Sequence, residues 1–307
     1  MSNKYSFGGY KIAVIARTNR TILVEGKDDK ELFNRLKLSI GGCESINVDS
    51  SDILDDHLTF GLGAKQRIDA FVSQIPTGSS LVEKFRCFVD REWEELVDQS
   101  TLEPLPWTEP KLTEVRLKTN GHSIENYGFV WEFVEIYLKH FGRGVATELL
   151  LKEVSGALPN FLRAAAAFSE VARKRHVLSR CTDIIDLDDI DWDGEKILLK
   201  SSIECKLSAR GCQNANGILE EYLACYAGKW SVPPFETETH YHAHGHIGDA
   251  IIWGGIAKIS MRQGVSEQIG REIATGRQDE KRRVWHGWLS GLPVNQIYPI
   301  RRAFADN

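Results

Sequence analysis

The 307-residue sequence lacks the features of several protein classes. Its six cysteines form no C-x-x-C pair and no closely spaced framework, which argues against a disulfide-stapled secreted mini-domain and makes reduced thiols our expectation. It contains no uninterrupted apolar stretch long enough to span a bilayer. Its first twenty residues have no charged segment followed by a long apolar one. We therefore expect a cytoplasmic protein without a membrane partner.

An excess of positive charge is also missing. The formal net charge is −5, from 38 Lys and Arg against 43 Asp and Glu. A protein of this charge has no overall attraction to a polyanion, so nucleic-acid binding would have to come from local basic patches. The run GLGAK at 61–65 has neither the full spacing of a phosphate-binding loop nor a Ser or Thr after its lysine. We therefore expect no nucleotide-hydrolysing motor, and the glycines most simply serve a turn.

Short aliphatic and β-branched runs alternate with helical patterns in the first part of the chain. In the segment after the first of these runs, Leu32, Phe33, Leu36 and Leu38 recur near helical spacing. Strands that alternate with helices are typical of a parallel sheet. The predicted fold class is therefore α/β, with a parallel sheet flanked by helices. The predicted strands are Thr21–Val24, about 46–48, 85–90 and 114–121.

From about residue 128 the pattern becomes helical, as in WEFVEIYLKHF and RAAAAFSEVARK. We predict one domain over residues 1–127, which carries the sheet, and a second, mainly helical domain over residues 128–307. The second domain would serve regulation, dimerisation or substrate binding. The acidic run DIIDLDDIDWDGE at 183–195 is interpreted as a solvated linker or surface loop.

Acidic residues follow two of the predicted strands. Glu25 ends the first strand, Gly26 permits a sharp exit, and Asp29 lies near the start of the next helix. Asp90 and Glu92 end another strand, and both carboxylates face one opening if the backbone stays extended. Ligands of open parallel sheets bind beyond the carboxyl ends of the strands, and Mg²⁺ or Mn²⁺ neutralises clustered carboxylates well. For each motif alone, helix-start or turn acids are the alternative explanation.

These residues resemble a known family. VEGKDD is similar to the E-G-x-x-D signature of Toprim domains, and DRE is similar to their second motif, D-x-D, with Glu92 in place of the usual Asp. The segment TNGHSIENY at 119–127 resembles Toprim proteins of bacterial defence loci, including the AriB-type nucleases of PARIS anti-phage systems and the overcoming-lysogenization-defect nucleases. The resemblance implies a Toprim-like fold over roughly the first 130 residues. It implies a metal site built from Glu25, Asp29, Asp90, Glu92 and Glu125.

The resemblance also implies a function. Toprim nucleases of this kind cleave phosphodiester bonds with Mg²⁺ or Mn²⁺, and the AriB type implies RNA, tRNA in particular, as the target of a toxic abortive-infection effector. An ATPase partner of the AriA type would hold the effector until a phage signal releases it, and the active form is expected to be a homodimer. The alternative is a non-catalytic Toprim adaptor that binds protein or nucleic acid, which the Glu92 departure and the acidic net charge favour.

A nuclease site also needs a cation or proton donor near the scissile phosphate. Lys118 and His122 belong to the same predicted loop as Glu125, so we predict catalytic roles for both beside Glu25, Asp90 and Glu92. The alternatives are a solvated strand-end lysine, a capping or packing histidine and a surface or capping glutamate.

Two basic clusters could contact nucleic acid, although a solvated helix face is the usual role of such runs. The second cluster is interleaved with tryptophans that could stack on bases. The clusters are Arg173, Lys174 and Arg175, and Lys281, Arg282 and Arg283.

Four histidines occupy alternate positions in THYHAHGHIGD, so an extended backbone would place them on one face. Zinc is one hypothesis, but structural zinc sites draw ligands from two separated segments and this run has no nearby cysteine. A polar strand or partner surface is the preferred interpretation. The residues are His240, His242, His244 and His246.

Overall fold

The computed structural model describes residues 4–40, 43–142, 144–181, 183–233, 235, 238–275, 278–293 and 296–305. The chain divides into two compact units. Unit 1 consists of Met1–Arg91, Glu109–Asn120 and His286–Asn307, and unit 2 consists of Glu92–Thr108 and Gly121–Trp285. This division differs from the single boundary predicted after residue 127, because the chain passes between the units four times.

Unit 1 contains a four-stranded sheet in which all neighbouring strands are parallel. Its strand order is β2-β1-β3-β4. All residues of β1 and β3 are buried, as expected for parallel strands covered on both faces. The predicted α/β class, with a parallel sheet flanked by helices, is thus confirmed, although the last strand is shorter than predicted. The strands are β1 (Thr21–Val24), β2 (Asn47–Ser50), β3 (Phe85–Val89) and β4 (Arg116–Lys118).

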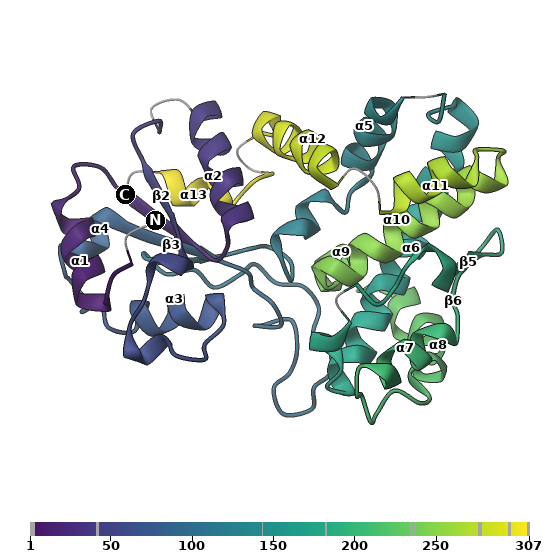
Figure 1. The fold of residues 1–307 in the computed structure, drawn as a ribbon, viewed down its shortest axis with the longest axis horizontal. Helices are drawn as coiled ribbons and strands as arrows, with labels where there is room; N and C mark the ends of the chain where they lie inside the picture. The colour runs from purple at the N-terminus through teal and green to yellow at the C-terminus, as the bar shows by residue number, and fades with distance from the viewer. Residues whose placement is uncertain are drawn as a thin grey trace. The chain divides into compact units, whose positions relative to one another are not determined.

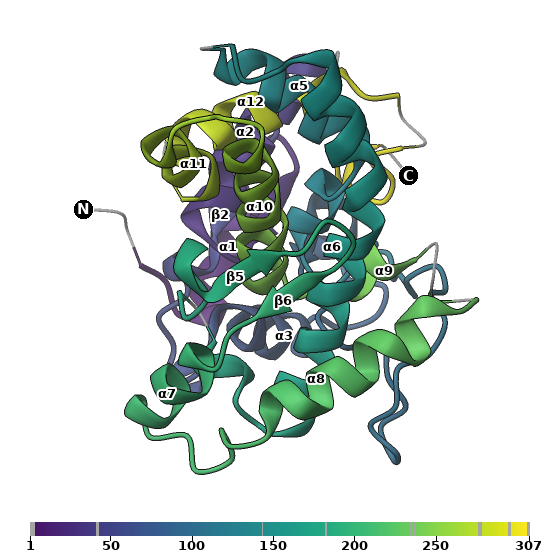
Figure 2. The same ribbon diagram turned by 90° about the vertical axis from the view of Figure 1, so that its right-hand side faces the viewer.

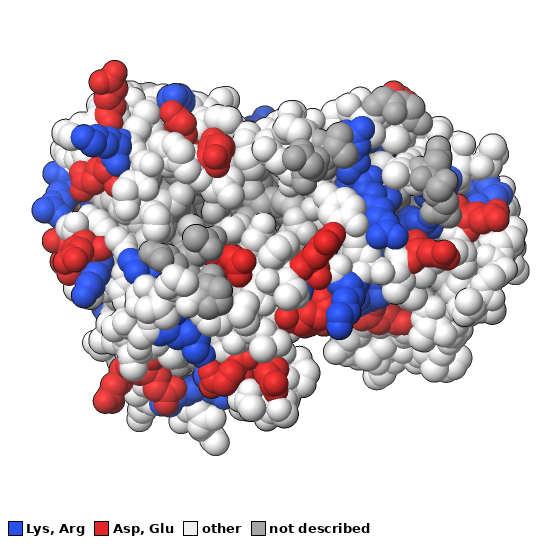
Figure 3. All heavy atoms as spheres, turned by 180° about the vertical axis from the view of Figure 1, so that it is seen from behind, with Lys and Arg blue, Asp and Glu red and all other residues white. Residues whose placement is uncertain are grey.

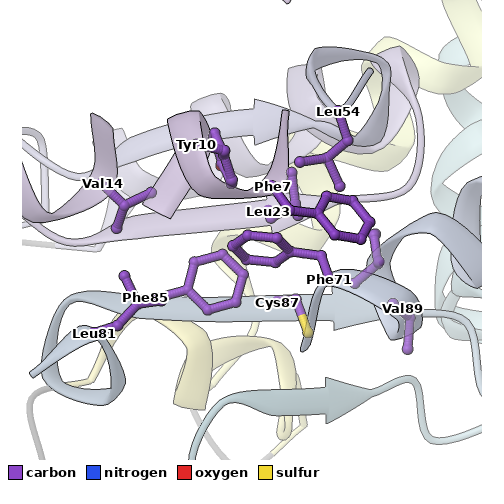
Figure 4. Packing of buried hydrophobic residues seen from close by; sticks show 11 residues of the cluster. Phe7, Tyr10, Val14, Leu23, Leu54, Phe71, Leu81, Phe85, Cys87 and Val89 are labelled. Carbon is purple, nitrogen blue, oxygen red and sulfur yellow. The ribbon is translucent and has the colours of Figure 1, made fainter. Parts of the chain in front are cut away.

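One face of this sheet is covered by α1 (Phe7–Ala16), α3 (Ala64–Val72) and the short α4 (Leu81–Lys84). Figure 4 shows the aromatic core between these helices and the strands, with Phe71 packed edge-on against Phe85 at a centroid distance of 5.3 Å. Alternate β3 residues, from Phe85 to Val89, join this core because side chains alternate across a strand.

The other face is covered by α2 (Lys27–Ser39) and α13 (Ile300–Phe304) (Figure 1). Phe33 of α2 contacts Phe88 of the sheet at 5.1 Å and stacks on Phe304 at 5.5 Å. This packing explains why the last segment belongs to unit 1 and not to the helical unit. The periodicity predicted for α2 is correct except at its end, where the side chain of Leu38 is 66% exposed.

Unit 2 is mainly helical, and α6 and α10 form its centre (Figure 2). The helix Glu148–Lys174 has 27 residues and continues through Pro159. Its buried face is rich in alanine, which lets neighbouring helices approach closely. The helices are α5 (Trp131–Phe141), α6 (Glu148–Lys174), α7 (Ser202–Ala209), α8 (Ile218–Ala227), α9 (Thr239–His242), α10 (Gly245–Arg262) and α11 (Glu267–Ala274). A further helix, α12 (Gln278–Gly291), begins in unit 2 and ends in unit 1.

The acidic run 183–195 is not a solvated linker. It contains β5 (Ile190–Trp192), which pairs in an antiparallel hairpin with β6 (Ile197–Leu199). Ile190 and Trp192 are buried while Asp191 between them is exposed, and β5 packs against α10 (Figure 2). The linker prediction was wrong because the run is a folded part of unit 2, in which Asp191 faces outward from the strand and the buried Asp189 pairs with Lys206.

Charged side chains of both signs are interspersed on the face shown in Figure 3, among the residues drawn in colour. This agrees with a chain whose acidic and basic residues are nearly balanced. Across the described part of the chain, no helix combines the length and apolar character needed to cross a membrane.

Candidate functional site

The candidate site of unit 1 lies at the carboxyl edge of its parallel sheet. Glu25 directly follows β1, and Asp90 directly follows β3. These strands are hydrogen-bonded neighbours, with Val24 in register with Phe88. The two acids therefore leave adjacent strands at one edge, which is where ligands bind in open parallel sheets.

A hydrogen bond joins the two acids. Oε1 of Glu25 accepts from the backbone N–H of Asp90 at 2.7 Å. On the other side, Ser51 Oγ donates to the carbonyl oxygen of Glu25 at 2.8 Å. Both acids are half-buried, so their carboxylates are partly shielded from water. The structure thus brings together two residues that the sequence predicted to share a site.

Asp29 forms the start of α2. Its Oδ2 accepts a hydrogen bond from the N–H of Gly26 at 2.8 Å, which satisfies a backbone donor that the helix itself leaves unpaired. This contact matches the alternative explanation of Asp29 as a helix-start acid. Its predicted role as a metal ligand stays a prediction.

Buried cations lie at the same edge. Lys118, the last residue of β4, is 3% exposed and is in register with Val89, which precedes Asp90. Arg91 is fully buried, and its guanidinium donates to the carbonyl of Asn120 at 3.0 Å. The burial contradicts the alternative of Lys118 as a solvated lysine.

Lys65 is a residue of this edge that the sequence analysis did not select. It lies in the first turn of α3, it is 8% exposed, and its Nζ donates to the carbonyl oxygen of Arg91 at 3.3 Å. The run GLGAK was recognised only as a failed phosphate-binding loop. The sequence signal that could have identified Lys65 is its place just after a glycine turn, at the start of a helix that follows a strand.

Glu92 departs from the geometry that the sequence suggested. The prediction required an extended backbone from Asp90 to Glu92, but Glu92 has a φ of 52°, in the left-handed region. Its N–H donates to the carbonyl oxygen of His122 at 2.6 Å. The chain enters unit 2 at Glu92, whose side chain is exposed. The extended backbone that would turn the carboxylates of Asp90 and Glu92 toward one opening is therefore not formed.

Unit 2 joins two motifs that are far apart in the sequence. The N–H of His122 donates to the carbonyl oxygen of Tyr241 at 2.8 Å, and the side-chain amide of Asn126 donates to the carbonyl oxygens of His240 and Ala243. Residues 121–127 of the segment TNGHSIENY are thus held against the histidine-rich segment.

Imidazole rings also meet at this junction. His122 is 5% exposed, and its ring lies 4.8 Å from that of His244 and 4.7 Å from that of Trp93. Burial, together with the neighbouring charge of His246, lowers the pKa of His244 to about 4. His244 is therefore neutral at physiological pH.

Glu125 lies against the first turn of α10. A Cβ atom at Gly245 would be 2.5 Å from Oε2 of Glu125 and 2.6 Å from Oγ of Ser123, so only glycine permits this approach. The carboxylate is half-buried, and within the described residues it forms neither a hydrogen bond nor an ion pair. The positive end of the α10 dipole favours a negative charge at this place.

The extended histidine strand is contradicted. Residues 239–242 form α9 and residue 245 begins α10, so the four histidines do not share one face. His242 is instead fully buried against Trp230 and Phe235. Among the residues that the structure describes, no group of three or more His, Cys, Asp and Glu side chains is arranged to hold a metal ion.

The pair Glu25 and Asp90 nevertheless has the donor set that magnesium uses. Mg²⁺ commonly binds through one or two carboxylates and fills its other positions with water and substrate phosphate, so it does not need an all-protein cage. Two carboxylate residues on adjacent strand ends at an open sheet edge fit such an ion.

The side chains of the first basic cluster interact with other residues of unit 2. Arg173 lies over the ring of Trp93 at 5.1 Å. Lys174 pairs with Glu103 and Glu170, both at 2.7 Å, and Arg175 pairs with Glu221 at 2.7 Å. These contacts match the structural explanation of the cluster, and its contact with nucleic acid stays a prediction.

The second basic cluster lies on α12. Lys281 pairs with Asp249 at 2.6 Å and lies over the ring of Trp253 at 5.1 Å. Arg282 pairs with Asp279 at 2.7 Å. Arg283 is exposed and donates to a backbone carbonyl at 3.2 Å. Of the six predicted nucleic-acid-binding cations, Arg283 alone has an exposed side chain.

No protein-family model matches the chain, and no curated protein matches it.

Proposed function

We propose that this protein is a divalent-metal-dependent hydrolase of phosphodiester bonds, with Glu25 and Asp90 as its central residues. The observation that carries the proposal is the hydrogen bond between the carboxylate of Glu25 and the N–H of Asp90 at the carboxyl edge of a parallel sheet. This bond orients the Glu25 carboxylate beside the backbone of Asp90 on the adjacent strand end, and such positioning lowers the cost of binding a cation.

The chain itself contributes orientation and charge. The backbone N–H of Asp90 sets the direction of the Glu25 carboxylate. Lys118 and Lys65 add positive charge beside the strand ends, where charge develops on a phosphate that is being cleaved. A bound Mg²⁺ or Mn²⁺ supplies further positive charge for the phosphate oxygens and lowers the pKa of a coordinated water. We propose Lys118 as the group that stabilises the leaving oxygen.

The more specific assignments rest on the Toprim resemblance of the sequence. We propose a Toprim fold for the sheet-containing unit, RNA as the substrate, with tRNA as the leading candidate, and a role as a toxic effector of anti-phage defence in the cytoplasm. An AriA-type ATPase partner and an active homodimer belong to the same proposal. Glu92, His122 and Glu125 lie in unit 2, and the proposal for Glu25 and Asp90 does not depend on them.

A cleavage assay tests the proposal. Purified protein is incubated with end-labelled total tRNA and Mg²⁺ or Mn²⁺, and Glu25→Gln is compared with the matched control Glu44→Gln, an exposed carboxylate elsewhere in unit 1. We expect cleavage by wild type and by Glu44→Gln, and its loss in Glu25→Gln or with a chelator. Equal cleavage by all three proteins would reject the assignment of Glu25.

A non-catalytic adaptor is the second candidate. Two observations favour it: the left-handed backbone at Glu92 and the lack, within the described residues, of a metal-holding group of three side chains. Titration calorimetry with Mn²⁺ separates the candidates. An adaptor shows no binding that depends on Glu25, whereas the hydrolase shows binding that Glu25→Gln weakens.

A further inference from the structure

A cavity of about 630 Å³ lies in unit 1, at the edge of the sheet opposite Glu25 and Asp90. Its lining residues precede three of the parallel strands, whose amino ends share one edge, or belong to the segment 301–305. The volume lies within the range of small-molecule sites. The lining residues are Thr18, Asn19 and Arg20 before β1, Ile40, Cys43, Ser45 and Ile46 before β2, Glu83 and Lys84 before β3, and Arg301, Phe304 and Ala305.

The charge of this lining opposes the charge of the whole chain. Among the described lining residues, Arg20, Lys84 and Arg301 outnumber the one carboxylate, that of Glu83, whereas the chain has a net charge of −5. Lys37 adds a further cation beside the cavity, since its Nζ donates to the carbonyl oxygen of Ile46 at 3.0 Å.

Two of these cations are not neutralised by acids. Lys84 donates to the carbonyl oxygens of Ile15 and Arg17, both at 2.9 Å. Arg301 is half-buried, and its guanidinium has no hydrogen-bond or ion-pair partner among the residues that the structure describes. A half-buried guanidinium carries five donors in a fork that matches phosphate, so a partner anion would satisfy it.

A buried arginine strengthens the positive field. Arg86 is 2% exposed and donates to the carbonyl oxygens of Val82 and Phe85. Burial lowers its pKa, and the nearby charges of Arg20 and Arg302 lower it further while Glu114 raises it. Cations are thus crowded at the amino ends of β1 and β3.

We propose that this cavity binds a nucleoside phosphate, at a site separate from the candidate metal site. The cations would hold the phosphate, with Arg301 as its main contact, and Ile40, Ile46 and Phe304 supply apolar wall for the base. An inorganic phosphate would leave most of a 630 Å³ volume empty. Walls contributed by four separate segments suit a small ligand better than a continuous nucleic-acid strand.

Calorimetry tests this proposal. ATP and AMP are titrated into the full chain in the presence of a chelator, which removes any contribution of a metal site. Wild type is compared with Arg301→Gln and Arg301→Glu, and the matched control is Arg302→Gln, which removes the same charge from the next residue of α13. We expect Arg301→Gln to weaken ATP binding by about tenfold or more, Arg301→Glu to abolish it, and Arg302→Gln and Glu25→Gln to retain it within about twofold.

Four results would overturn the proposal. They are no heat with ATP or AMP at millimolar concentration, equal affinity in the Arg301 variants, equal affinity for inorganic phosphate and AMP, and Arg301-dependent binding of an RNA oligonucleotide without binding of ATP or AMP. Photo-crosslinking of wild type with an azido-ATP gives a readout that needs no variant. Labelled peptides should come from the lining segments around Ile46 or Phe304, and labelling confined to other segments contradicts the site.

Discussion

Oε1 of Glu25 accepts a hydrogen bond from the backbone N–H of Asp90 at 2.7 Å. The two residues are 65 positions apart, and the parallel pairing of β1 with β3 places them side by side. Both residues therefore directly follow the most buried strands of unit 1, and the backbone of Asp90 orients the Glu25 carboxylate.

The Asp90 side chain can be tested without loss of this hydrogen bond, because the bond uses only its backbone. We expect Asp90→Asn to lower the rate of metal-dependent cleavage by about a hundredfold or more, while its melting temperature stays near that of wild type. Single-turnover kinetics with end-labelled tRNA give the rate. A variant that melts normally and cleaves at the wild-type rate would remove Asp90 from the site.

Replacement of Gly245 by alanine is predicted to destabilise unit 2, because the Glu125 and Ser123 side chains would have to move. A methyl group there would lie 2.5 Å from Oε2 of Glu125, so we expect Gly245→Ala to lower the free energy of unfolding by about 1–3 kcal/mol. Gly156→Ala is the matched control, because that helical glycine has open space around it and alanine there should add about 0.5–1 kcal/mol. Urea denaturation measures both. Equal effects of the two substitutions would contradict the close approach of Glu125.

Glu103 should make the stability of unit 2 depend on pH in the acidic range. Lys174 and Lys229 lower the pKa of Glu103 from 4.5 to about 2 in the folded chain. The contribution is complete above pH 4.5 and is lost as the pH falls toward 2, because protonation then removes the charge that both lysines bind.

Thermal melts of Glu103→Gln and wild type between these pH values test this. We expect wild type to be the more stable protein near neutrality and the two curves to converge at low pH, with a smaller difference at high salt because half of the Glu103 side chain is exposed. Glu220→Gln, an exposed acid of α8, is the control and should run parallel to wild type. A constant difference at all pH values would contradict the ion-pair explanation.

The left-handed backbone at Glu92 predicts a stabilising substitution. Glycine adopts a φ of 52° without the steric cost that glutamate bears, so Glu92→Gly should raise the free energy of unfolding by about 1 kcal/mol. Gln99→Gly, in an exposed turn of the same segment, should lower it. Denaturation curves for both variants measure these free energies. A destabilised Glu92→Gly would contradict the prediction, because the contacts of the Glu92 side chain would then stabilise the fold by more than its left-handed backbone destabilises it.

The sheet and its acidic edge could be predicted because their signals are local. The aliphatic run from Thr21 to Val24 ends in Glu25, and FRCFV ends in Asp90. Parallel pairing then necessarily places both acids at one edge. The hydrogen bond between them could not be predicted, since it depends on the register of two strands.

Other features depend on tertiary packing. The histidine-rich segment alternates in sequence like a strand, yet burial of His242 and the start of α10 at Gly245 make it helical. The last segment of the chain carries no local signal for its place in unit 1, which depends on packing of α13 against β3 and β4 and on the stacking of Phe304 on Phe33. Lys65 could not be assigned to the site from sequence because its position depends on a carbonyl group 26 residues away.

The most direct test of the central claim is a crystal soaked with Mn²⁺ and measured for anomalous scattering. We predict a peak within bonding distance of the carboxylate oxygens of Glu25 and Asp90, and the loss of this peak in Glu25→Gln. A map with no peak at these oxygens, at a Mn²⁺ concentration that supports cleavage, would contradict it.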